Sequence, residues 1–383
     1  MTEKRIVCIT DVCSSIFAGG DAPKKQFSFE QTEDCCYPVF SNGESNNGLY
    51  GYTNTARVTE PSITVSARGT IGFTAIRLTP FTPIVRLISI TPIQDIIDID
   101  YLYYALSNYT PENTGTSIPQ LTVPMIKKYK FRLPEKDEQK RAVKVLKQID
   151  NILEKEKKQI QKLDELIKSR FVEMFGDPVI NSKEFSVFSL QEMIDNSYIV
   201  YHLDGNHGGD YPRNEEFVSE GVPYIGANCI DDGTVSFRKA KYLTQERANR
   251  LRKGIAKNND VLFAHNATVG PVAILKTTKE KIILSTSLTA YRCNTNKILP
   301  LYLRSYMQSE GFIRQYANDM KQTTRNQVPI TAQKKYLFIV PPLELQIKYA
   351  DFVSQVDKSK TAVKQSIKKL ETLKKSLMQE YFG

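Results

Sequence analysis

The sequence lacks the patterns that zinc-binding, redox and membrane proteins need. It has three histidines, and its six cysteines form no C-x-x-C pair: Cys8, Cys13, Cys35, Cys36, Cys229 and Cys293. Zinc knuckles and thiol redox motifs use such pairs, so we predict no metal site and reduced thiols. The sequence has no apolar run of about 18 residues and no signal-length apolar core near its start, which predicts a soluble protein of the cytoplasm.

Motifs of catalysis are also missing. The sequence contains no Asn-Pro-Pro-Tyr-like methyltransferase motif, no G-x-x-x-x-G-K-[ST] phosphate loop, and no dinucleotide-binding fingerprint after Gly19–Gly20. Asp177–Pro178 follows a long helical pattern and is interpreted as a helix stop. Glu138–Lys140 matches the tail of a nuclease E-x-K pattern, but no suitable Pro-Asp pair precedes it. We therefore predict a protein that is not an enzyme, with no catalytic residues and no cofactor.

Positive charge is in excess. The chain has 52 Lys and Arg against 42 Asp and Glu, a formal net charge of +10. Such an excess suits a phosphate-binding surface, because each cation that neutralises a phosphate releases a counterion. With 383 residues, 41% of them hydrophobic, the chain is long enough for two or three globular domains.

An internal repeat organises the chain. Residues 127–176 align without a gap with residues 334–383, an offset of 334 − 127 = 207, and 18 of these 50 pairs are identical. Upstream the same landmarks recur with looser spacing: Gly69–Gly72, for example, corresponds to Ala267–Gly270. We therefore predict two variable domains, residues 1–133 and 179–340, each followed by a fixed helical segment, residues 134–178 and 341–383.

The fixed segments are expected to form long amphipathic helices. Glu135–Phe175 contains no Pro or Gly, and its apolar residues recur at a spacing of three or four, interrupted by Glu156; Lys360 interrupts the second copy. Each helix would pack on its own domain, on a second copy of the chain, or on the other helix; we favour the last. A pseudo-twofold would then make the helices antiparallel, with the variable domains at opposite ends. The predicted seam is Leu146, Ile149, Leu153, Ile160, Leu163, Ile167, Val353, Val356, Val363, Ile367, Leu370 and Leu377.

Together these features resemble the specificity subunits of Type I restriction-modification systems. The resemblance rests on a variable domain, then Pro134 to Gln139 or Pro341 to Gln346, then a Lys/Glu-rich helix closing on Phe-Gly. Asp204–Pro212 and the turn Gly69–Gly72 also resemble the family's recognition domains, although the second copy of that turn has Ala267 in place of glycine. The implied fold is α+β: two mixed α/β target recognition domains related by pseudo-twofold symmetry and separated by two long antiparallel coiled-coil helices.

The resemblance also implies a function. Each domain would read half of a split double-stranded DNA target in the major groove. The helices would space the halves and dock two copies of an adenine methyltransferase subunit, and an ATP-dependent restriction and translocase subunit would join for cleavage. Two alternatives stay open: the specificity part of a related system that cuts on both sides of its site, and a scaffold for RNA or protein.

Candidate DNA-binding residues are those whose side chains suit bases or phosphates. Arg suits guanine, Asn and Gln suit adenine, and Lys or hydroxyl groups suit phosphates. His202, His207 and His265 are more simply explained as loop or core residues than as metal ligands, although His265, beside Asn266, is also a candidate contact. The candidates are Lys24, Lys25, Asn42, Ser45, Asn46, Asn47, Tyr50, Arg68, Thr70, Arg213, Asn228, Arg238, Lys241, Tyr242, His265, Asn266, Thr268 and Arg325.

Overall fold

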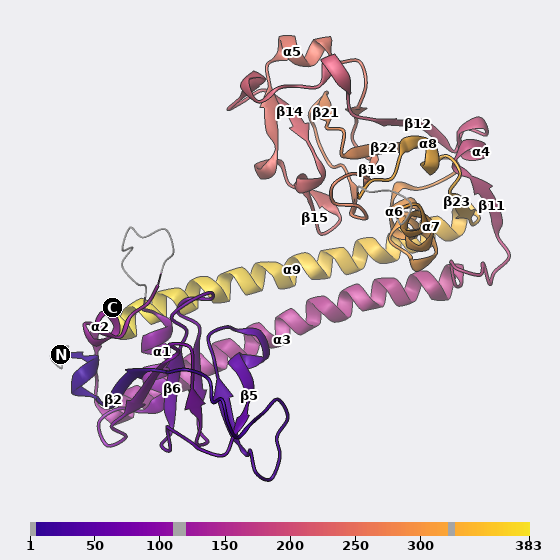
Figure 1. The fold of residues 1–383 in the computed structure, drawn as a ribbon. Coiled ribbons are helices and arrows are strands. Elements are labelled where there is room, and N and C mark those ends of the chain that lie inside the picture. The colour runs from indigo at the N-terminus through magenta and orange to yellow at the C-terminus, as the bar shows by residue number, and fades with distance from the viewer. Residues whose placement is uncertain (1–4, 110–119, 321–325) are drawn as a thin grey trace. The chain divides into compact units, whose positions relative to one another are not determined.

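The computed structural model describes residues 5–109, 120–320 and 326–383 and divides the chain into two units. The first unit comprises residues 1–159 and 363–383, and the second comprises residues 160–362. The two long helices, α3 (Lys136–Phe175) and α9 (Leu343–Phe382), are each divided between the units. Each unit therefore contains one sheet-bearing domain and a pair of helix segments (Figure 1). Among the described residues, no helix is long and apolar enough to span a membrane.

The first unit contains two four-stranded sheets. One has the order β2-β9-β6-β7 and the other β3-β5-β4-β8, while β1 and β10 form a two-stranded ribbon. Helix α1 lies between the β6 sheet and the long helices (Figure 1), where the Tyr101 ring packs 4.7 Å from that of Phe382. The elements are β1 (Ile6–Cys8), β2 (Cys13–Ala18), β3 (Phe27–Ser28), β4 (Tyr37–Phe40), β5 (Leu49–Thr53), β6 (Ser62–Val65), β7 (Thr74–Arg77), β8 (Thr82–Pro83), β9 (Ile88–Pro92), α1 (Ile99–Ser107), α2 (Val123–Lys127) and β10 (Lys130–Arg132).

The second unit repeats this plan with a larger outer sheet. Its inner sheet, β12-β22-β19-β20, matches β2-β9-β6-β7, and its outer sheet has the order β13-β17-β14-β21-β18. Strands β11 and β23 form the ribbon, and β15 and β16 add a hairpin. The strands are β11 (Ser186–Ser189), β12 (Ile199–Asp204), β13 (Phe217–Val218), β14 (Val222–Ile225), β15 (Ile230–Asp231), β16 (Thr234–Val235), β17 (Lys241–Leu243), β18 (Ile255–Ala256), β19 (Val261–Ala264), β20 (Val272–Ile274), β21 (Ile282–Leu284), β22 (Leu288–Cys293) and β23 (Leu337–Val340). The helices are α4 (Leu190–Asp195), α5 (Gln245–Arg250), α6 (Pro300–Met307), α7 (Glu310–Met320) and α8 (Ile330–Gln333).

Within each unit the helix segments pair in opposite directions. In the first unit, Lys374 Nζ lies 2.5 Å from Asp150 Oδ1, and Ser366 Oγ donates to Glu156 Oε1 at 2.6 Å. Residue numbers thus rise along α3 as they fall along α9, so the predicted antiparallel pairing is confirmed. Together with the sheets of the two units, the helices confirm the predicted α+β fold class. In the second unit, Lys360, predicted as a polar interruption of the seam, pairs with Asp164 at 2.5 Å.

The predicted seam divides into buried and half-buried positions. Leu146, Ile149, Leu153, Val353 and Val356 are buried, and of these Leu146 and Val353 belong to the hydrophobic cores of their units. In a pair of helices each helix is covered by its partner on one side only, so the remaining seam residues keep part of their surface in water. The half-buried positions are Ile160, Leu163, Ile167, Val363, Ile367, Leu370 and Leu377.

A buried glutamine fastens each long helix to its own domain. The amide of Gln139 donates to the carbonyls of Pro134 and Ile96, and its Oε1 accepts from the Asp98 N–H at 2.8 Å. Its repeat partner Gln346 does the same in the second unit with Pro341, Lys297 and Leu299. The repeated Pro-to-Gln spacing therefore places one buried side chain that bonds three backbone groups in each unit.

Candidate nucleic-acid interface

Two polar turns of the first domain lie next to each other. The side chain of Asn42 bridges them: its Oδ1 accepts from the Ala67 N–H at 2.7 Å, and its Nδ2 donates to the Val85 carbonyl at 2.6 Å. The Gly43 N–H also donates to Ser66 Oγ at 3.2 Å. The side-chain amide of Asn42, which we predicted to contact DNA, therefore forms hydrogen bonds that hold the turns together. Its neighbours Ser45, Asn46 and Asn47 are exposed.

A buried arginine that sequence reasoning missed supports these turns. Arg77 is 5% exposed, lies 3.6 Å over the Phe40 ring, and donates to the Asn47 carbonyl at 2.8 Å and to Thr64 Oγ1 at 3.1 Å. Burial lowers the pKa of its guanidinium to about 10. In sequence Arg77 is one cation in a strand, and nothing there distinguishes it from a solvent-exposed residue.

The second turn carries Arg68 and Thr70, both exposed. Arg68 Nη2 donates to Gln120 Oε1 at 3.0 Å. Gly69 has a φ of 70°, and its counterpart Ala267 in the second unit has a φ of 65°. The alanine thus adopts the left-handed conformation that glycine favours, so the turn keeps its backbone shape despite the substitution.

An exposed aromatic cluster accompanies Lys24 and Lys25. Phe27 packs 5.2 Å from Phe29 and 5.5 Å from Tyr50, measured between ring centroids, and Phe29 is 76% exposed. The lysines precede β3 and are exposed as well. Exposed apolar surface beside cations is typical of a binding surface.

The candidates of the second domain form two groups, and Ser287 links the two turns that make up the first group. Its carbonyl accepts from the His265 N–H at 3.0 Å, and its Oγ accepts from the Ala227 N–H at 2.9 Å. The turn that carries Asn266 and Thr268 therefore lies beside the turn that carries Asn228, as the corresponding turns do in the first domain.

The second group surrounds β17. Lys241 Nζ lies 4.5 Å from the centroid of the Phe217 ring and 3.3 Å from Asn214 Oδ1, which places it near Arg213. Tyr242 is half-buried and donates through its hydroxyl to the Phe237 carbonyl at 3.2 Å, whereas Arg213 and Arg238 are exposed.

His265 and Arg325 differ from the other candidates. The structure does not support a direct DNA contact by His265, because its side chain is 2% exposed and its Nδ1 lies 3.0 Å from the Val328 carbonyl. Burial also lowers the pKa of His265. Arg325 lies outside the described residues.

A buried polar network holds His202 in the second domain. His202 Nε2 lies 3.1 Å from Oε1 of Gln333, which also accepts from the Tyr291 hydroxyl at 2.6 Å. Gln333 Nε2 donates to Thr289 Oγ1 at 3.1 Å. Burial lowers the pKa of His202 from 6.5 to about 4, so the folded protein holds this imidazole neutral at neutral pH.

The second unit should lose stability as pH falls from about 6.5 to about 4. In this window His202 takes up a proton in the unfolded chain but not in the folded one, so lowering the pH favours unfolding by about 1.4 kcal/mol for each pKa unit between the two states. Denaturant unfolding across this range should show a shallower pH slope for His202→Gln than for the unaltered protein. Equal slopes would exclude His202 as a source of the pH dependence.

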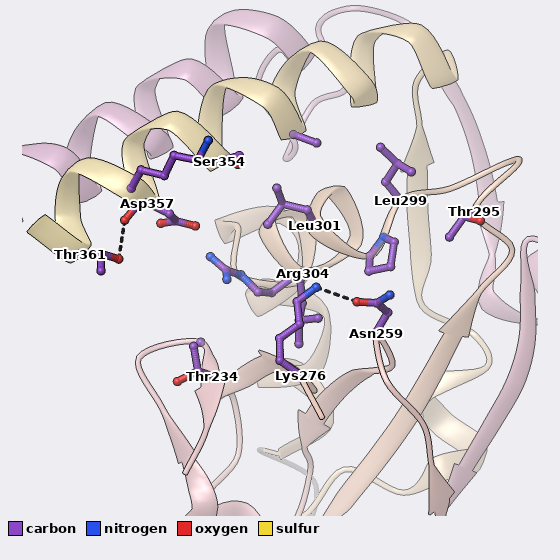
Figure 2. A pocket seen from close by; sticks show the side chains of 15 residues that line it. Thr234, Asn259, Lys276, Thr295, Leu299, Leu301, Arg304, Ser354, Asp357 and Thr361 are labelled. Carbon is purple, nitrogen blue, oxygen red and sulfur yellow. Dashed lines mark hydrogen bonds between the residues drawn. The ribbon is translucent and has the colours of Figure 1, made fainter. Parts of the chain in front are cut away.

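A pocket of about 710 Å³ opens in the second unit between its sheet-bearing domain and α9 (Figure 2). Three cations line it, Lys276, Arg304 and Lys358, together with the carboxylate of Asp357. Sequence reasoning missed them. The remaining lining is Gly233, Thr234, Asn259, Ile274, Thr295, Leu299, Pro300, Leu301, Ala350, Ser354 and Thr361.

Comparison with known families gives a direct match. The model of the Type I restriction modification DNA specificity domain matches residues 1–165 and 180–373, which together make up most of the chain. The chain belongs to this family. Each of the two matched segments contains one recognition domain of this specificity protein and most of the long helix that follows it in sequence.

Individual relatives of the specificity family match parts of the chain. Two putative type I specificity subunits of Mycoplasma pneumoniae are 35% and 33% identical over 144 residues, which are 38% of this chain and 42% and 39% of the relatives. The chain thus spans less than half the length of these two relatives. The type I restriction enzyme MjaVIII specificity subunit of Methanocaldococcus jannaschii is 23% identical over 293 residues, covering 74% of this chain and 69% of the relative.

Solved structures share the fold of this specificity protein. A Type-I restriction-modification S subunit from M. genitalium aligns with a TM-score of 0.56 at 16% identity, covering 100% of this chain and 97% of that chain. A chain from a structure of type I R-M complex assembly and conformational transition aligns with a TM-score of 0.55 at 14% identity, covering 98% and 97%.

Proposed function

We propose that the chain is the DNA-reading subunit of a Type I restriction-modification complex and that each unit reads one half of a bipartite double-stranded target. One observation carries this proposal. The two units repeat the inner sheet, the ribbon and the glutamine anchor, but they differ in the outer sheet and in the exposed turns. The repeated elements form the same scaffold in both units, while the different turns present different donors and acceptors to DNA. The half-sites should therefore differ, and the target should not be a palindrome.

The partners that we propose follow from the family. Two copies of an adenine methyltransferase subunit would dock on the helices, and an ATP-dependent restriction and translocase subunit would join them, in the cytoplasm. The chain itself would supply no catalytic group, which is consistent with the missing methyltransferase and phosphate-loop motifs. The family match does not favour the scaffold for RNA or protein.

Activity assays on the purified protein test this proposal. The isolated chain should neither transfer methyl groups nor cleave DNA nor hydrolyse ATP when the cofactors are supplied. The complex with a co-purified methyltransferase subunit should methylate one bipartite sequence. Robust turnover by the isolated chain, or methylation without sequence preference by the complex, would contradict the proposal.

A further inference from the structure

The pocket of the second unit contains a guanidinium group with an unsatisfied donor. Arg304, on α6, points into the space between α9 and the turn that carries Thr234 (Figure 2). Its Nε is buried, and no described residue accepts a hydrogen bond from it. Buried donors are nearly always paired, and guanidinium donors pair most strongly with planar or tetrahedral oxyanions. The pocket lining thus includes a guanidinium group whose Nε has no hydrogen-bond acceptor among the described residues.

The surroundings of Arg304 hold the guanidinium in place and add charge. Gly233 has a φ of 73°, and a Cβ at this position would lie 3.2 Å from Arg304 Nη1, so the glycine leaves room for the guanidinium. Lys276 is fixed by a 2.6 Å hydrogen bond from its Nζ to Asn259 Oδ1 (Figure 2), and Lys358 is exposed on α9. Three cations against the single carboxylate of Asp357 leave the lining positively charged.

A second hollow extends the positive charge toward candidate DNA contacts. A pocket of about 550 Å³ shares Lys276 with the first and adds Lys279 and Phe237 to the lining. Phe237 begins the short helical turn that also contains the exposed Arg238. The two pockets therefore extend from α9 to Phe237, which is the sequence neighbour of a residue that the sequence assigns to DNA binding.

We propose that this pocket binds a phosphate group of the DNA backbone, with Arg304 as the principal donor and Lys276 and Lys358 as supporting cations. The inference rests on the proposed function and extends it, because it names a backbone contact in the second unit, where α6 faces α9. Phosphate contacts set the position of a protein on the duplex without reading its sequence. The same chemistry would accept a free phosphate or a mononucleotide, so the experiment must separate these sources.

The test compares Arg304→Gln with Arg314→Gln in the full-length chain, together with any subunit that co-purifies. Both variants remove one positive charge, but Arg314 is exposed on α7 and lies outside the pocket. Affinity for target and for unrelated duplex is measured as a function of salt. Arg304→Gln should weaken both affinities roughly tenfold. It should also make the negative slope of log affinity against log salt shallower by about 0.9, because one phosphate contact is lost. Arg314→Gln should leave the slope unchanged.

Further arms assign a failure to its cause. Lys358→Gln, at an exposed helical position, should also lower the salt slope, and it keeps the test valid if Arg304→Gln misfolds. Inorganic phosphate or AMP is also tested for protection of the unaltered protein against heat. If this protection is lost in Arg304→Gln while DNA binding is unaltered, the site binds a free anion, and the proposed backbone contact is overturned. Loss of subunit assembly with unaltered DNA binding would instead assign the pocket to a protein carboxylate. If Arg304→Gln and Lys358→Gln both bind DNA as Arg314→Gln does, the inference fails, whereas a chain and complex that bind no duplex would overturn the proposed function.

Discussion

Replacing residues 1–133 with the corresponding domain of another specificity protein should change one half of the methylated sequence and leave the other half intact. Most candidate contacts of this domain lie in two of its turns, Ser41–Gly48 and Ser66–Phe73, and hydrogen bonds within the first unit hold those turns together. No candidate residue of the second unit takes part in these bonds. Genome-wide methylation mapping of a complex that carries the exchanged chain would reveal the new target.

The exchange must preserve the contacts that hold the domain to its helices. Tyr101 donates to the Arg132 and Tyr381 carbonyls, and the Tyr104 hydroxyl donates to Asp150 at 2.8 Å. A donor domain with tyrosines at both positions keeps these bonds. The reciprocal exchange of residues 179–340 is the matched control, and it should alter only the opposite half. If both halves change in either experiment, the two domains are not independent readers.

The helical part of the fold was predictable because its physics is local. A 3–4 apolar spacing without Pro or Gly specifies a long amphipathic helix, and α3 and α9 begin and end within two or three residues of the predicted segments. The pattern also singled out Glu156 and Lys360, but it did not identify their partners, Ser366 and Asp164. Those partners depend on the direction and register of the pairing, which the structure supplies.

The candidate site was less predictable because its residues converge from distant segments. His265 precedes the polar turn residue Asn266, yet its side chain is buried and contacts the Val328 carbonyl, and residue type alone gave no sign of this. Arg304 lies in α6, the helix that corresponds to α1 in the first unit. Tyr101 of α1 donates to the Arg132 carbonyl, and Tyr302 of α6 donates to the Ile339 carbonyl. These two acceptors are 207 residues apart, the offset of the repeat. The offset between these tyrosines is 302 − 101 = 201, so the first copy has Tyr103 in place of Arg304. This difference between the copies was the available signal.

Changing either anchoring glutamine to methionine should destabilise its own unit by about 2–4 kcal/mol. Gln139→Met keeps the length of the side chain but leaves the Asp98 N–H and the carbonyls of Ile96 and Pro134 without their partner. Gln346→Met does the same in the second unit. Both glutamines are buried, so water does not readily replace the lost bonds. Denaturant unfolding gives the loss of stability, and hydrogen exchange at the Asp98 and Leu299 amides locates it.

The repeat provides a matched control for this substitution. Gln148 and Gln355 are also related by 355 − 148 = 207, lie on the same two helices, and are exposed. Changing either of them to methionine should alter the free energy of unfolding by no more than about 0.5 kcal/mol. Exchange should accelerate at Asp98 in Gln139→Met and at Leu299 in Gln346→Met, each without an effect on the other amide, because each glutamine bonds only within its own unit. If Gln139→Met lowers the free energy of unfolding by no more than Gln148→Met does, the glutamine of the repeated Pro-to-Gln spacing does not hold the helix to its domain. The repeated scaffold proposed to support both recognition domains must then depend on other contacts.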